Sequence, residues 1–192
     1  MIVSLVSALV LIQTPAAAQD GPMATAPRVV ESQDGPVATA GPASGETTEA
    51  LRIREAVAYA NPMPRGAPEG DYPLVAWCEA LVNGHVALGE TLNTTDPLDL
   101  DIMRLGRLEA ADFHSALQAA EPRQTPASRA AARAAAAEAA GKWTPLEGQS
   151  QAVRSQAFGL FFGLPGRCEH AARRIRDNIT TPPVTPEEAG LE

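Results

Sequence analysis

Two cysteines are the feature that most restricts how this chain can fold, and the compartment in which it folds decides whether they join. Residues 2–12 form an apolar run, and three alanines at 16–18 follow it. An apolar run of this length before a small-residue site is typical of a secretory signal peptide. We therefore predict a signal peptide over residues 1–18, cleavage after Ala18, and a periplasmic or secreted mature protein. A buried N-terminal helix and an uncleaved anchor are the alternatives. The run is shorter than the about 20 residues of a membrane span, so we expect no transmembrane segment after cleavage.

In an oxidising compartment two thiols form a disulfide, so we expect Cys78 to be bonded to Cys168. The bond closes a loop of about 90 residues, which loop-entropy arithmetic values at about 4–5 kcal/mol of stability. A metal site and a reactive thiol are the alternatives. Cys78 and His85 lie too far apart along a helix to hold one ion, and Cys168 and His170 point to different sides of a helix. We expect neither a metal nor a cofactor.

The ends of the chain differ in composition from its middle. Residues 19–48 contain a duplication, QDGPMATA at 19–26 and QDGPVATA at 33–40, and are rich in Gly, Pro, Ala and Thr. Such a segment cannot bury a core, so we predict a disordered linker over 19–48. Residues 182–192 are predicted to be a flexible acidic tail. The middle, residues 49–181, is nearly neutral and is predicted to form one helical domain.

Apolar residues recur at helical spacing within this domain, between breaks made by Pro and Gly. Helix starts are predicted at Asp71, at Thr95 or Asp96 before a proline, at Thr125, and at the capping box that begins at Thr144. A strand is the competing prediction for the first segment, near Leu51. We expect an all-α fold of five to six short helices in a compact bundle, at about 49–60, 71–93, 97–121, 126–141, 145–164 and 167–181.

Three of these segments have distinctive surfaces. The 71–93 segment has two adjacent apolar stripes, which place it at the centre of the bundle, and Gly84 weakens its middle or admits a close neighbour. The 127–140 segment has no apolar residue larger than alanine. It either packs very closely on a neighbour or lies outside the bundle as a partner-binding element. In the 145–164 segment the residues expected to face inward are Val153, Ala157, Leu160, Phe161 and Leu164. Phe158, Phe161 and Phe162 are expected to anchor the core.

Two groups of residues are candidates for function. Glu79, Asn83 and His85 lie on one helix and could form a polar pocket, although a hydrogen bond on the helix surface explains them as well. The second group consists of arginines that could bind an anionic partner: Arg129, Arg133, Arg167, Arg173, Arg174 and Arg176. The alternative for these is pairing inside the molecule, since residues 50–121 carry 11 acids and 5 bases while 122–181 carry 4 acids and 9 bases.

No catalytic motif accompanies these groups; the best local grouping is Asp112 to Ser115, whose neighbours point apart on a helix. The net charge of −8 and the few aromatic residues argue against nucleic acid as a partner. We expect an exported, non-enzymatic helical module that binds an envelope protein or an anionic envelope component. The alternatives are an enzyme with a site around Glu79, Asn83 and His85, and a purely structural envelope protein.

Overall fold

The computed structural model describes residues 46–161 and 163–191. The predicted signal peptide, residues 19–45 of the predicted linker, and Phe162 lie outside the described residues.

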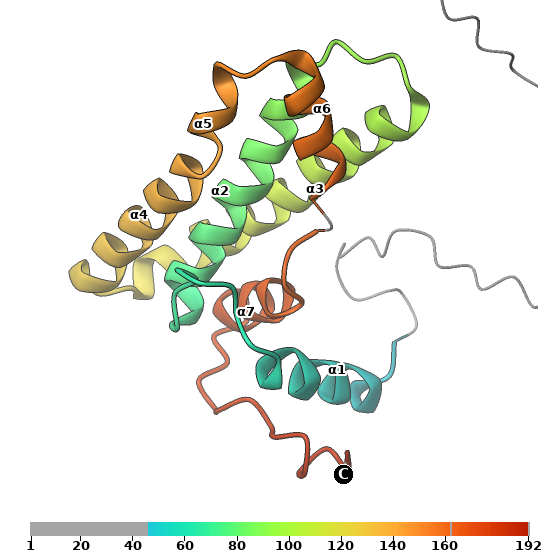
Figure 1. The fold of residues 1–192 in the computed structure, drawn as a ribbon. Coiled ribbons are helices and arrows are strands. Elements are labelled where there is room, and N and C mark those ends of the chain that lie inside the picture. Colours follow the sequence, from blue (N-terminus) through green and yellow to red (C-terminus); the bar gives the residue numbers. More distant parts are fainter. Residues whose placement is uncertain (1–45, 162, 192) are drawn as a thin grey trace, which may run out of the picture. The chain divides into compact units, whose positions relative to one another are not determined.

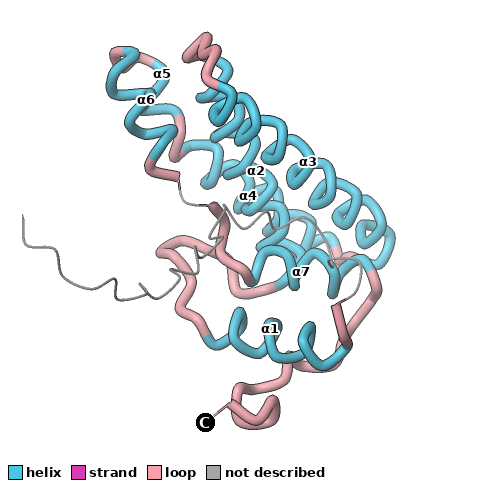
Figure 2. Tube along the Cα trace, turned by 90° about the vertical axis from the view of Figure 1, so that its right-hand side faces the viewer, coloured by secondary structure: helices cyan, strands magenta, loops and turns pink. Residues whose placement is uncertain are grey.

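The described part of the chain is all-helical and has no strand, which confirms the predicted fold class (Figures 1 and 2). Its elements in chain order are α1 (Thr48–Ala60), α2 (Asp71–Glu90), α3 (Pro97–Ala120), the 3₁₀ turn η1 (Glu121–Arg123), α4 (Pro126–Gly141), the single turn α5 (Thr144–Glu147), α6 (Gln151–Gly159) and α7 (Arg167–Arg176).

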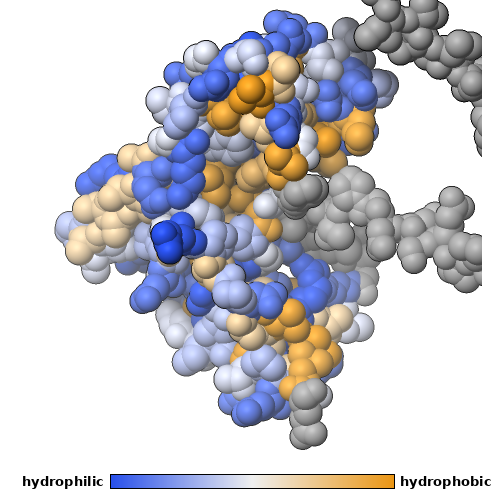
Figure 3. Space-filling view, in the orientation of Figure 1, coloured by the Kyte–Doolittle hydropathy of each residue, from blue (hydrophilic) through white to orange (hydrophobic). Residues whose placement is uncertain are grey.

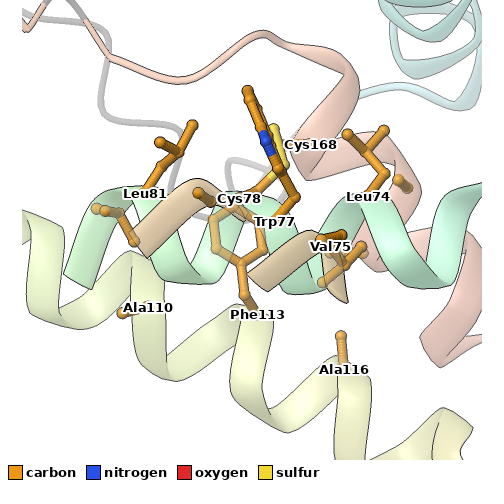
Figure 4. Close-up of a cluster of buried hydrophobic side chains, with 14 residues drawn as sticks. Leu74, Val75, Trp77, Cys78, Leu81, Ala110, Phe113, Ala116 and Cys168 are labelled. Atoms are coloured by element: carbon orange, nitrogen blue, oxygen red, sulfur yellow. A yellow bond between two sulfur atoms is a disulfide. The ribbon is translucent and has the colours of Figure 1, made fainter. Parts of the chain in front are cut away.

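Helix α2 is the central element, as its two apolar stripes predict. It packs along α3, α4 and α7, and Figure 1 shows it between α4 and α3. The main core gathers around Leu74, Trp77 and Cys78 of α2 and Phe113 of α3 (Figure 4). Because the helix is covered on several sides, an apolar stripe on one face alone would not suffice.

The disulfide is present and joins Cys78 on α2 to Cys168 on α7, with 6.1 Å between the two Cα atoms. Both cysteines are fully buried in the main core. The bond therefore ties the central helix to the last one, as the sequence predicts.

Two helix starts follow the predicted capping chemistry. The Asp96 carboxylate accepts a hydrogen bond from the Leu98 amide at 2.8 Å, and Pro97 is the first residue of α3. The Thr125 hydroxyl accepts from the Ser128 amide at 3.1 Å, and Pro126 is the first residue of α4. In both cases a side-chain oxygen satisfies an amide that has no partner inside the helix.

The capping box predicted at Thr144 is wrong. The chain enters α5 with helical backbone already at Trp143, so Thr144 lies inside the turn and does not cap it. Gly148 ends this turn, and Ser150, whose backbone is extended, caps α6 by accepting from the Val153 amide. One predicted helix is therefore two short ones.

The inward side chains predicted for this region are also partly wrong. Phe158 is buried in a second, smaller cluster with Leu88, Leu92 and Met103. Val153 and Leu160 are exposed, because only one face of the nine-residue α6 meets α2. Of the three phenylalanines expected to anchor the core, Phe158 is buried, Phe161 is half-buried against His85, and Phe162 lies outside the described residues.

The predicted ends of two helices need correction. Asp71 does not cap α2; Gly70 occupies that position, and the Asp71 carboxylate instead accepts from Tyr59 and Arg174. Helix α7 ends at Arg176, because Asn178 adopts a left-handed backbone and the Ile179 amide bonds back to the carbonyl of Arg174 at 2.9 Å. This pair of features is the Schellman stop, which terminates a helix without a proline.

Residues 182–191 form no helix. They contain a turn in which Thr185 and Glu188 hydrogen-bond each other's amides, and Arg52 of α1 donates to the Glu188 carbonyl. Beside it, α1 packs on α7 (Figure 2). The C-terminal segment thus contacts the first helix.

Candidate functional site: the groove between α2 and α4

A groove of about 820 Å³ lies between α2 and α4, and one residue each of α5 and α6 also lines it. Small-molecule sites in proteins commonly have about 300–1,000 Å³, so the groove is large enough for a ligand. Its lining residues, which define the α2–α4 groove, are Ala80, Asn83, Gly84, Ala87, Leu88, Thr91, Ala136, Ala137, Ala140, Trp143, Glu147 and Arg154.

The alanine-rich α4 forms one wall of the groove. Ala132, Ala135 and Ala139 recur at helical spacing and are buried, the last two in the main core. Ala136, Ala137 and Ala140 lie on the neighbouring face and line the groove. Of the two possibilities that the sequence leaves open, close packing is the one observed, since alanine lets α4 lie directly on α2. Figure 3 shows the pale apolar surface over α4 that results.

Trp143 lines the groove and lies against Gly84. A Cβ atom at Gly84 would stand 2.1 Å from Cδ1 of Trp143, closer than any real contact. Trp143 packs against both hydrophobic clusters, and its indole nitrogen is buried with no hydrogen-bond partner. The absence of a side chain at Gly84 therefore lets the Trp143 ring pack directly on the α2 backbone.

His85 follows Gly84 in α2, but its side chain is buried in the core. It is 4% exposed, and its Nε2 donates to the Phe158 carbonyl at 3.0 Å. Its ring stacks on Phe158 at 4.4 Å between centroids, with Phe161 at 4.4 Å and Trp143 at 5.9 Å. Burial lowers the pKa of His85 below its usual range, and the hydrogen bond to Phe158 opposes this in part. His85 thus holds the end of α6 on α2.

The three residues of the predicted polar pocket have different neighbours. Glu79 meets His114 of α3, with 2.9 Å between Oε1 and Nδ1, and the Gln118 amide donates to the other ring nitrogen at 2.9 Å. Asn83 is exposed and lines the α2–α4 groove, while His85 faces the aromatic side chains. Spacing along one helix does not reveal that His114, on another helix, is the partner of Glu79.

Three arginines of α7 form ion pairs inside the molecule. Arg173 and Arg174 each bond a different oxygen of Glu55, at 2.8 Å and 3.0 Å. Arg174 also reaches Asp71 at 3.1 Å and donates to the Thr181 carbonyl, and Arg176 bonds Asp112 at 2.6 Å. Each of these pairs joins the basic half of the domain to its acidic half.

The other predicted arginines lie in two places. Arg167 stacks on the Tyr59 ring with 4.3 Å to its centroid. Arg129 and Arg133 line a second pocket of about 260 Å³ with Tyr72 and Glu121. The six arginines therefore do not form one continuous surface.

Arg154 is a candidate functional residue that the sequence analysis did not select. It is half-buried on α6 and lines the groove. Its guanidinium forms no ion pair with any residue that the structure describes, and its Nε is buried with no hydrogen-bond partner. An isolated arginine in a short helix carries no sequence signal, because only the packing of α6 on α2 brings it to the groove.

Within residues 46–161 and 163–191, no group of three or more His, Cys, Asp or Glu side chains is arranged to hold a metal ion. None of the described helices combines the length and the apolar character that crossing a membrane requires. Comparison of the chain with protein-family models, with curated proteins and with solved structures finds no match.

Proposed function

We propose that this chain is an exported, non-enzymatic helical module that binds another component of the cell envelope, and that the α2–α4 groove is its binding site. The observation that carries the proposal is the groove itself, an opening of about 820 Å³ whose lining is mostly apolar and includes four polar side chains, Asn83, Thr91, Glu147 and Arg154. Binding sites for small and medium ligands typically combine these two properties.

Export is supported by two features at different places in the chain. The buried Cys78–Cys168 disulfide suits a protein that folds in an oxidising compartment. Residues 1–18 have the composition of a cleaved signal, so the mature protein would begin at Gln19. N-terminal sequencing of the protein isolated from its native cells tests this directly. A mature chain that still contains residues 1–18 would contradict it.

The alternatives draw less support from the geometry. Glu79 contacts His114, His85 bonds the Phe158 carbonyl, and Asn83 lines the groove, so the three offer no common point at which a substrate would meet them all. A purely structural role leaves the open groove without a use.

Site-specific photocrosslinking in the native envelope tests the proposal. A small diazirine amino acid is placed at Ala137, which lines the groove, or at Ala134, an exposed position of the same helix outside it. We expect adducts from Ala137 and few or none from Ala134, with helical content and disulfide unchanged in both. Equal yields at the two positions, or no adduct at either, would contradict a binding role for the groove.

A further inference from the structure

We infer that the α2–α4 groove holds an aliphatic chain that ends in an anionic group, and that Arg154 binds the anion. This inference rests on the proposed function and names the chemical class of the ligand. The terminal group is a carboxylate or a phosphate, since the guanidinium fork binds either through two parallel hydrogen bonds.

The walls of the groove favour a slender apolar body. Lining residues of α2 extend from Ala80 to Thr91, which corresponds to about 16 Å at 1.5 Å per residue. The lining side chains between Ala80 and Leu88 and along α4 are mainly small and apolar, and Asn83 is the polar group among them.

The polar end of the groove is near Thr91. Gln151, at the start of α6, donates to the Leu92 carbonyl at 3.3 Å, which places the start of α6 beside the end of α2. Arg154 follows within one turn of α6. The Thr91 hydroxyl already donates to the Leu88 carbonyl at 2.7 Å. Arg154 is therefore the donor available to a ligand at this end, and Asn83 is the polar lining residue towards Ala80.

The charge at this end favours an anion. A half-buried guanidinium with a buried Nε that lacks an acceptor is an unfavourable arrangement, which an anionic oxygen relieves. Glu147 also lines the groove but is exposed, and it forms no ion pair with Arg154 within 4.0 Å. The arginine and the acid are thus separate groups, and a ligand anion does not have to displace Glu147.

Calorimetric titration of the full disulfide-bonded chain tests the inference with four probes that share one aliphatic chain. These are dodecanoate, dodecyl phosphate, dodecanol and dodecyltrimethylammonium, each kept below its micelle concentration. We expect one saturable site for at least one of the two anions, about tenfold weaker binding of the alcohol, and weaker binding still of the cation. Equal affinity for all four, or no saturable binding of either anion, would overturn the inference.

Variants assign the two parts of the site. Arg154→Gln should weaken binding of the anion about tenfold and leave the alcohol unchanged, whereas Glu147→Gln should not weaken the anion. Ala137→Leu should abolish binding, because the larger side chain fills the α2–α4 groove. Ala134→Leu, outside the groove, should leave binding unchanged. Loss of the alcohol in Arg154→Gln, or unchanged anion binding in both Arg154→Gln and Ala137→Leu, would count against the assignment.

The two experiments separate this inference from the proposed function. Groove adducts in the envelope together with no binding of either anion leave a binding role in place and overturn the ligand class. Tight anion binding together with no envelope adduct supports the ligand class and contradicts the envelope function.

Discussion

At the scale of single residues, two glycines of α2 are places where the backbone itself is the contact surface. Gly84 receives the indole of Trp143, and a Cβ at Gly89 would lie 2.5 Å from the Phe158 ring and 2.8 Å from the Met103 sulfur. Glycine costs a helix about 1 kcal/mol relative to alanine. Here that cost accompanies the packing of two large aromatic side chains on α2, the half-buried Trp143 just before α5 and the buried Phe158 of α6.

We predict that Gly84→Ala destabilises the protein by about 1–3 kcal/mol, because the new methyl group must displace Trp143. Gly141→Ala is the matched control, since a Cβ there would meet no atom within 4 Å. It should leave stability unchanged or raise it by up to about 1 kcal/mol. Urea unfolding measures both variants, and equal stability of the two would contradict the role of Gly84.

Two buried histidines give the protein a pH dependence. Burial lowers the pKa of His85 and of His170 below the ordinary value of 6.5. The unfolded chain binds protons at its ordinary pKa, and the folded chain does so only at lower pH. The free energy of unfolding should therefore be highest above about pH 7, where both histidines are neutral in either state, and should decrease as the pH falls below the ordinary histidine pKa.

Unfolding curves at a series of pH values measure this slope. His85→Gln, which retains a donor for the Phe158 carbonyl, should reduce the slope, and His170→Gln should remove a further part. A slope that neither substitution changes would show that these histidines titrate alike in both states.

At the scale of elements, α4 and α6 contact α2 in opposite ways. Helix α4 buries three alanines along one stripe and relies on a close approach of two backbones. Helix α6 buries a single large side chain, Phe158, and holds it by stacking on His85. The groove lies between these two kinds of contact, with a rigid wall on the α4 side and a lightly anchored helix that carries Arg154 on the other.

We predict that Ala139→Leu destabilises the protein by about 1–3 kcal/mol, because Ala139 is fully buried in the main core and a larger side chain must separate α4 from α2. Ala134→Leu, at an exposed position of the same helix, should change stability by no more than about 0.5 kcal/mol. Chemical unfolding of the pair measures the difference. Similar values for both would mean that α4 does not pack closely on α2.

At the scale of the whole molecule, α7 joins regions that are distant in the sequence. Cys168 bonds to α2, while Arg173 and Arg176 reach acids in α1 and α3. The separation of acidic and basic residues along the sequence is therefore used between elements of the same chain. Removing one partner of the buried Arg174–Glu55 pair would leave a buried charge unpaired, which is more costly than replacing both partners.

We predict that reduction of the disulfide lowers the free energy of unfolding by about 4–5 kcal/mol, because the bond restrains a loop of 90 residues in the unfolded chain. Unfolding with and without reductant measures the effect. The double variant Cys78→Ala with Cys168→Ala should show the same loss and no response to reductant. A change below about 1 kcal/mol on reduction would show that the unfolded chain is already compact.

The sequence by itself determined the helical fold and the covalent link. Periodicity, prolines and capping residues such as Asp96 and Thr125 act within a few residues of the chain, so they are visible without a structure. The pairing of Cys78 with Cys168 followed from their being the two cysteines in a chain whose first residues predict export.

Only the tertiary structure decided where α5 and α6 break, where α7 ends, and which residues line the groove. Thr144 has the residue type of a cap, but the backbone that arrives from α4 is already helical there. Arg154, Trp143 and Ala137 come together because helices distant in the sequence pack on α2. Their proximity is a property of packing, which depends on contacts between segments and leaves no pattern within any one segment.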